Sequence, residues 1–72
     1  MNFIPKLTKN KLFIYNASNG SIHKSITLPS NAKYEFAIAG EFVIVSIMFN
    51  NGTQRSRTYN MKTGTLKSDI SI

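Results

Sequence analysis

Three side chains that suit the binding of an anionic partner alternate along residues 54–60. Arg55, Arg57 and Tyr59 are spaced two residues apart, so an extended strand places all three on one face. Guanidinium groups pair with phosphates and a tyrosine ring stacks on a base, and these two contacts bind single-stranded nucleic acid without sequence preference. A second interpretation is that 54–60 is a solvated edge strand, since charged side chains on an edge discourage pairing with other chains.

A related pattern occurs 44 positions earlier, where Lys11, Phe13 and Tyr15 occupy the matching places. If both segments present the same face, the chain has a basic and aromatic sheet surface for nucleic acid or another anion. The competing interpretation is that these aromatic rings pack in the core, because their neighbours Leu12 and Ile14 are also apolar. The candidate anionic-partner site comprises Arg55, Arg57, Tyr59, Lys11 and Tyr15.

Residue types that carry catalysis are scarce. His23 is the only histidine, and the chain has no cysteine. The three carboxylates, Glu35, Glu41 and Asp69, are too scattered in the sequence for a paired-carboxylate site. The sequence contains neither a metal-ligand cluster nor a glycine-rich phosphate loop. We therefore expect a protein that is not an enzyme and that uses no cofactor and no metal.

Alternation of apolar and polar residues predicts an all-β fold of about six strands. No stretch of ten or more residues carries apolar side chains at helical spacing. Short connections favour antiparallel neighbours, so we expect an antiparallel meander, either as an open sheet or as a small barrel or sandwich. The expected strands are residues 11–16, 21–28, 33–39, 42–49, 54–60 and 65–72.

The apolar content of single strands predicts their places in the sheet. Residues 11–16 and 42–49 are apolar on both faces, which is typical of central strands. Pro5 suits a strand start or a sheet edge, because proline cannot donate to a ladder. Gly40-Glu41, with glycine first, favours a type II′ hairpin turn.

Two related halves, about 11–28 and 55–72, make up much of the chain. In each, a strand ends in a polar turn closed by glycine, and a second strand returns. The returning strands are expected to turn inward the apolar residues Ile22, Ile26 and Leu28 in the first half and Leu66, Ile70 and Ile72 in the second. Four positions are identical at an offset of 44: Tyr15/Tyr59, Asn16/Asn60, Gly20/Gly64 and Ile26/Ile70.

Three motifs follow one another in the second half: residues 39–46 (AGEFVIVS), the turn 50–52 (NNG) and residues 59–66 (YNMKTGTL). In this order they resemble a β-propeller blade of the quinoprotein-like (PQQ-repeat) type, and residues 11–28 resemble the second half of a preceding blade. The offset of 44 matches the blade length of about 40–45 residues. The resemblance implies about one and a half blades and a strand-and-turn layout. It implies no cofactor site, because no residue here matches the quinone-binding positions and the usual tryptophan is missing.

Composition limits the class of protein. Seventy-two residues with 42% hydrophobic content make a single small β domain, residues 1–72, and a chain this short buries only about 60% of its unfolded surface. The absence of cysteine excludes disulfides. No apolar stretch approaches the roughly 20 residues that span a bilayer, and the first residues do not resemble a signal peptide. We expect a cytoplasmic location and no membrane partner.

The net charge of +6 serves either solubility or an anionic partner. A short sheet with exposed edges favours association, so we expect a non-catalytic interaction module that acts through protein–protein contacts. Its partner is another protein or a second copy, and a homo-oligomer is expected. The alternative is a nucleic-acid-binding protein that uses the basic and aromatic face. A complete chain and a piece of a larger propeller both remain open.

Overall fold

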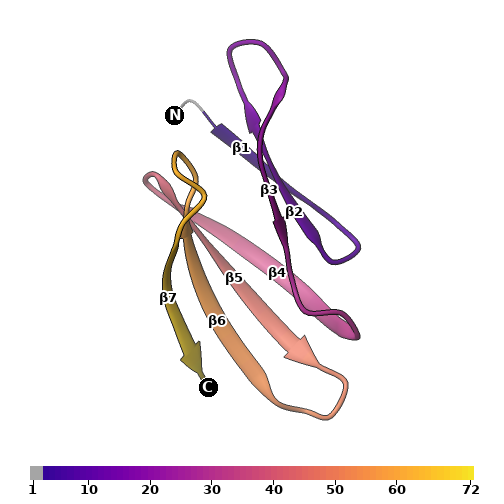
Figure 1. Cartoon of the computed structure of the whole chain (residues 1–72). Helices are drawn as coiled ribbons and strands as arrows, with labels where there is room; N and C mark the ends of the chain where they lie inside the picture. Colours follow the sequence, from indigo (N-terminus) through magenta and orange to yellow (C-terminus); the bar gives the residue numbers. More distant parts are fainter. Residues whose placement is uncertain (1–2) are drawn as a thin grey trace.

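Seven strands make up the computed structural model, which describes residues 3–72 (Figure 1). No helix occurs within these residues, which confirms the all-β class. The strands are β1 (Phe3–Thr8), β2 (Lys11–Asn16), β3 (Ile22–Thr27), β4 (Ala32–Ala39), β5 (Phe42–Phe49), β6 (Gln54–Asn60) and β7 (Leu66–Ser71).

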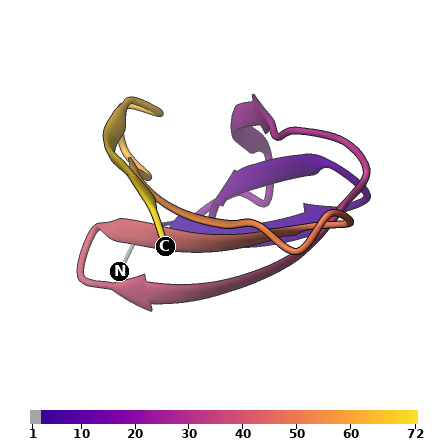
Figure 2. The ribbon, with the colours of Figure 1, turned by 90° about the horizontal axis from the view of Figure 1, so that it is seen from below.

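Two open antiparallel sheets form a meander in two layers (Figure 2). The first sheet has the order β1-β2-β3 and the second has the order β4-β5-β6-β7, and consecutive strands pair within each. Of the alternatives left open by the sequence, the described residues thus form two layers, and neither sheet closes into a barrel. The central places predicted for residues 11–16 and 42–49 are confirmed by β2 and β5.

The strands differ from the sequence-based expectation in the place of β6 and in the presence of β1. The prediction that residues 54–60 form an edge strand is wrong, because β6 lies between β5 and β7. Its polar residues do not mark an edge, since its arginines pair with Asp69 on the neighbouring β7. The strand that the sequence did not delimit is β1, an edge strand that contains Pro5, as the proline predicts.

The relation between the two halves extends to individual strand pairs. In β1-β2-β3, Phe3 lies opposite Asn16 and Tyr15 lies opposite Ile22. In β5-β6-β7, the corresponding pairs are Phe42 with Asn60 and Tyr59 with Leu66. The turns after β2 and β6 are closed by the same backbone bonds: Gly20 N–H to Asn16 and Gly64 N–H to Asn60, at 2.8 and 2.7 Å. The two three-stranded units therefore have the same local structure.

Each unit contains a bulge at the same place, and this corrects the expected facing of Ile22, whereas Leu28 is buried in the core and Ile26 packs against it, as expected. The ladder shifts between Ile14 and Tyr15 in the first sheet and between Thr58 and Tyr59 in the second. The extra residue turns Ile22 to the face opposite that of Ile26, and Ile22 is 56% exposed. The corresponding apolar residues of the last strand are also exposed: Leu66, Ile70 and Ile72.

The core lies between the inner faces, by which we mean the faces that the two sheets turn toward each other. The first sheet contributes Leu12 and Ile14, and the second contributes Val43 and Val45, all fully buried. The two sheets do not use the same face of the repeated unit. Val45, on the inner face of the second sheet, corresponds in register to Lys6, and Lys6 lies opposite Phe13 on the outer face of the first sheet. The two units thus stack in the same sense instead of face to face.

The hairpin turn between β4 and β5 has the geometry that its sequence predicts. Ala39 pairs with Phe42, which leaves a two-residue loop. Gly40 has φ 61°, whereas Glu41 is not among the residues with positive φ. Positive φ at the first loop position alone is the property of a type II′ turn, and glycine adopts it without steric cost.

Candidate functional site

The arginines of the predicted site form an ion-pair cluster with Asp69. Arg55 Nε donates to Asp69 Oδ1 at 2.9 Å. Arg57 lies opposite Asp69 in the β6–β7 ladder, and its Nε is 3.3 Å from Oδ2, an ion pair without a well-aligned hydrogen bond. Arg57 Nη1 also donates to the hydroxyl of Tyr59 at 3.4 Å. One carboxylate is thus shared by two cations.

The cluster changes the titration of its members. The hydrogen bond from Arg55 is the main cause that lowers the pKa of Asp69, and the charges of Arg55 and Arg57 lower it further against the opposing effect of desolvation. The pKa of Arg57 is raised above its ordinary value, first by the Tyr59 hydroxyl and then by Asp69, against partial desolvation. At neutral pH the cluster carries a net charge of about +1, since two guanidinium groups and one carboxylate are ionised.

The ring of Tyr59 is part of the core. It is only 5% exposed and packs with Val43, opposite which it lies in the ladder. A base cannot stack on a ring that is covered by protein. Arg55, Arg57 and Tyr59 do share one face, as their spacing predicts, and this is the inner face of the second sheet.

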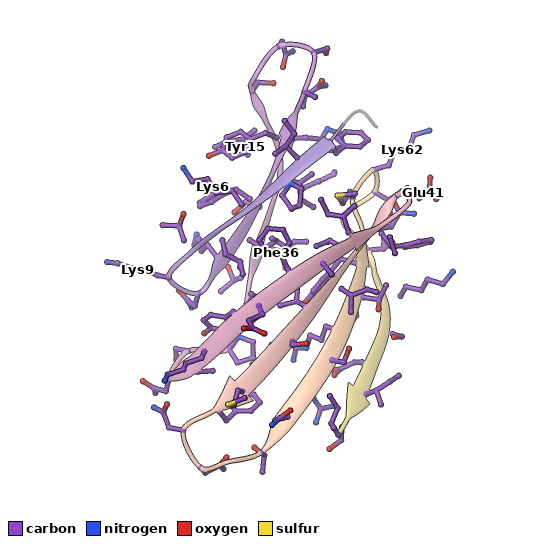
Figure 3. The ribbon with its side chains drawn as sticks, turned by 180° about the vertical axis from the view of Figure 1, so that it is seen from behind. Lys6, Lys9, Tyr15, Phe36, Glu41 and Lys62 are labelled. Atoms are coloured by element: carbon purple, nitrogen blue, oxygen red, sulfur yellow. The ribbon has the colours of Figure 1, made fainter. Side chains whose placement is uncertain are left out.

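Lys11 and Tyr15 lie elsewhere, on the outer face of the first sheet. The rings of Phe13 and Tyr15 are both half-buried there, with centroids 6.4 Å apart and planes inclined by 41°. Lys6, opposite Phe13, and Tyr15 project away from the second sheet (Figure 3). The structure therefore brings Lys6 and Lys11 together with two aromatic rings, and it separates them from Arg55 and Arg57.

His23 connects the two sheets and was not among the predicted site residues. It is the extra residue of the β3 bulge, and its Nε2–H donates to the backbone carbonyl of Lys62 at 2.6 Å. Its ring lies 4.6 Å from that of Phe3. The sequence could not indicate this role, because nothing local to His23 predicts a bulge or a contact 39 residues away.

A shallow depression of about 520 Å³ lies where the β1–β2 turn approaches the start of β4. Two lysines and three asparagines contribute to it, and no carboxylate does. Its lining residues are Lys9, Asn10, Ser30, Asn31, Ala32, Lys33, Tyr34 and Asn50. The hydroxyl of Tyr34 is directed to the carbonyl of Pro29, so this ring is held in place by the connection between the sheets.

Metal ligands are not gathered anywhere in the part of the chain that the structure describes: no group of three or more His, Cys, Asp or Glu side chains occurs there. Among residues 3–72 there is also no helix that is long and apolar enough to cross a membrane.

Apolar side chains and open strand edges coincide at β4. Phe36 and Ile38 are on its inner face, yet they are 39% and 48% exposed. β4 is an edge strand, and its outer side has no neighbouring strand within residues 3–72. An uncovered edge beside exposed apolar groups is a site at which another extended chain can add.

Comparisons with protein-family models, curated proteins and solved structures give no match to this chain. Its function is therefore inferred from its own geometry.

Proposed function

We propose that this chain is a non-catalytic β-sheet module that binds other protein chains, copies of itself included, through the open edges of its sheets. The observation that carries this proposal is the topology: β1, β3, β4 and β7 each have one side without a neighbouring strand in the described part of the chain. Such an edge presents N–H and C=O groups in a row, and an added strand satisfies them.

The distribution of apolar side chains supports the same proposal. Among residues 3–72, eight large apolar residues are exposed, as many as are buried in the core. A monomer this small has little buried area to offset the loss of chain entropy, so covering these groups stabilises the folded chain. The exposed residues are Ile4, Ile22, Phe36, Ile38, Met48, Leu66, Ile70 and Ile72.

The contacts made by three titratable side chains support the non-catalytic part of the proposal. His23 is engaged by a backbone carbonyl, and Asp69 by two arginines. Glu41 accepts a hydrogen bond from the amide of Asn60 at 3.3 Å in a turn. None of these three groups is placed to activate another, which general acid–base or nucleophilic catalysis requires.

The test is the molar mass of the purified chain, measured by sedimentation velocity from micromolar to millimolar concentration. Because strand pairing depends on backbone hydrogen bonds and apolar contact, we expect a mass above that of one chain, with little change between low and high salt. A single-chain mass over the whole range refutes binding to copies of itself.

The second candidate function is binding of single-stranded nucleic acid, and the outer face of the first sheet favours it. There Lys6 and Lys11 flank the half-buried rings of Phe13 and Tyr15. Titration with a labelled oligonucleotide tests this candidate, with Lys11→Ala as the variant and Lys33→Ala on the second sheet as the control. Affinity that falls steeply with salt and with Lys11→Ala supports it. No binding at low salt refutes it.

A further inference from the structure

The first sheet lacks a counterpart of β4. Since β1, β2 and β3 match β5, β6 and β7 pair by pair, the second sheet has one strand more, on the side of β5. The equivalent position beside β1 holds no strand of residues 3–72. Figure 2 shows β4 at one margin of the molecule, beyond the strands of the first sheet. A strand position is thus vacant next to β1 and over β4.

The side chains beneath this position are apolar and uncovered. Phe36 lies opposite Val45, and Ile38 lies opposite Val43. The valines are fully buried, whereas Phe36 and Ile38 are 39% and 48% exposed, although all four are on the same inner face. The start of β4 is covered, since Ala32 and Tyr34 are half-buried and pack against the core. The cover ends part-way along the strand, which leaves Phe36 and Ile38 more exposed than the valines opposite them.

Along β4, the backbone N–H and C=O groups that point to the open edge belong to the residues whose side chains lie on the inner face. In an antiparallel strand, the N–H and C=O of one residue point to the same neighbour, and successive residues alternate. Asn50 N–H donates to the carbonyl of Asn31 at 3.3 Å, so the odd-numbered residues of β4 face β5. The residues that face outward are Tyr34, Phe36 and Ile38.

The same reasoning gives the free groups of β1. Leu28 N–H donates to the carbonyl of Asn10 at 2.7 Å, so Asn10 faces β3 and Lys11 faces β1, where it pairs with Thr8. Thr8, and every second residue before it, therefore faces β2. The residues that face outward are Phe3, Pro5 and Leu7.

We propose, building on the function proposed above, that two copies of the chain form a two-fold dimer in which β4 of each copy fills the vacant position beside β1 of the other. The axis runs parallel to the strands between the two layers. Each layer then becomes one continuous antiparallel sheet, β3-β2-β1 followed by the partner's β4-β5-β6-β7. Phe36 and Ile38 of one copy pack against the same residues of the other.

Strand direction agrees with this arrangement. β1 and β5 run the same way, and β4 runs back against them (Figure 1). The depression lined by Lys9 and Ala32 places the end of β1 near the start of β4. A two-fold axis along the strands preserves their directions, so the partner's β4 is antiparallel to β1, as a meander sheet requires.

One register also satisfies charge and hydrogen bonding. With the partner's Phe36 opposite Pro5, outward-facing residues lie opposite one another along the whole of β1. On the outer face, Lys6 then lies opposite the partner's Glu35, a favourable cross-strand pair. A slip of two residues places that glutamate opposite Thr8 instead. Pro5, which is already buried in the single chain, has no N–H, so the junction lacks one bond at this residue.

The other two edges are built to resist pairing. Both bulges lie on β3 and β7, with His23 and Lys67 as the extra residues. Bulges and cations at an edge turn other strands away. β1 and β4 have regular ladders without a bulge. The dimer uses the two regular edges and leaves the two irregular ones in solvent, so it is closed and does not grow.

The first experiment measures the dimerisation constant of the full chain by sedimentation equilibrium. We expect a dimer that Phe36→Arg weakens by more than about a hundredfold, because the cation is brought to the centre of the contact in both copies. Ile70→Arg is the control, since Ile70 is 57% exposed on β7, far from the junction. Circular dichroism confirms that both variants keep strand structure. A dimer that Phe36→Arg leaves unchanged overturns the dimer geometry while the proposed function stands. A monomeric wild type overturns the dimer together with the self-association part of the proposed function, and leaves binding to other proteins to be tested separately.

The second experiment tests the register by exchanging charges. Lys6→Glu and Glu35→Lys are each expected to weaken the dimer by about two- to fivefold per pair, and the double variant should restore it. Both side chains are exposed, so neither change disturbs the core. Equal and additive losses without restoration refute this register.

Hydrogen exchange of the backbone amides tests the strand pairing in the wild-type chain, without any substitution. On dilution from dimer to monomer, the amides of Leu7, Tyr34, Phe36 and Ile38 should lose protection. The amides of Lys6 and Ala37 face neighbours within the same chain and should stay protected at both concentrations. Protection of the first group that does not depend on concentration contradicts the proposed pairing.

Discussion

The Nε2 atom of His23 lies 2.6 Å from the backbone carbonyl oxygen of Lys62, and this bond joins the bulge of β3 to the turn after β6. Few polar contacts connect the sheets, so this one has a measurable share in holding them together. His23→Ala should lower the free energy of unfolding by about 1–2 kcal/mol, through the lost hydrogen bond and the lost contact with the Phe3 ring. Urea unfolding followed by circular dichroism measures it, with Ser25→Ala on the outer face as the control.

Acid should weaken the fold through Asp69. The pKa of this group is lowered in the folded chain, chiefly by the hydrogen bond from Arg55, so the unfolded chain binds the proton more readily. Its stabilising contribution is therefore complete above the ordinary carboxyl pKa and is lost as the pH falls through the lowered value. Melting temperatures should decline in this acidic range.

Asp69→Asn provides the matched comparison. We expect it to lower the melting temperature at neutral pH, because two arginines lose their counter-charge, and to make the acid decline shallower. A variant with the same acid decline as the wild type would show that other carboxylates cause it. Glu41→Gln, at an exposed position in the β4–β5 turn, controls for the loss of a charge and keeps an oxygen that accepts from Asn60.

The two repeated glycines allow a paired test of the turn geometry. Gly20 and Gly64 have φ 73° and 75°, but a Cβ atom on Gly20 would meet nothing within 4 Å, whereas one on Gly64 would lie 3.1 Å from Lys24 Cδ. Gly20→Ala should cost about 1–2 kcal/mol from the left-handed backbone alone. Gly64→Ala should cost at least as much, and Lys24→Ala in the same chain should remove any excess. An excess that persists after Lys24→Ala contradicts this explanation.

The core should be sensitive at Leu12. This side chain is fully buried between the sheets, so Leu12→Ala should cost about 2–5 kcal/mol, which is enough to unfold much of a small domain. Met48→Ala, at a position 48% exposed, should change the free energy of unfolding by far less. Thermal unfolding of the two variants under the same conditions compares them.

Much of the fold could be predicted because strand alternation and turn glycines are local signals. β2 to β7 follow from them, and so does the type II′ turn at Gly40. β1 was not delimited, because Pro5 and Lys6 interrupt its apolar alternation. The facing of Ile22 was wrong because a bulge shifts the register by one residue, and no local property of the sequence reports the shift.

The candidate site was predicted only in part. Two-residue spacing gives the shared face of Arg55 and Arg57 correctly. The burial of Tyr59 and the pairing of the arginines with Asp69 depend on which strands become neighbours and which sheet covers them. The same dependence separates Lys11 from Arg55, although they occupy equivalent places in the repeat.

Because the two units stack in the same sense, equivalent positions are buried in one unit and exposed in the other. Their residue types must therefore differ. Positions that are Leu7, Leu12 and Ile14 in one copy are Ser46, Ser56 and Thr58 in the other. The second sheet carries these hydroxyl groups on its outer face and so ends the stack of sheets, as a capping repeat does in a solenoid. Replacing those hydroxyls with aliphatic residues, and Lys6 with the valine of the equivalent position 45, would let the outer face of the second sheet pack on the first sheet of the next molecule, and a discrete particle would become a fibre.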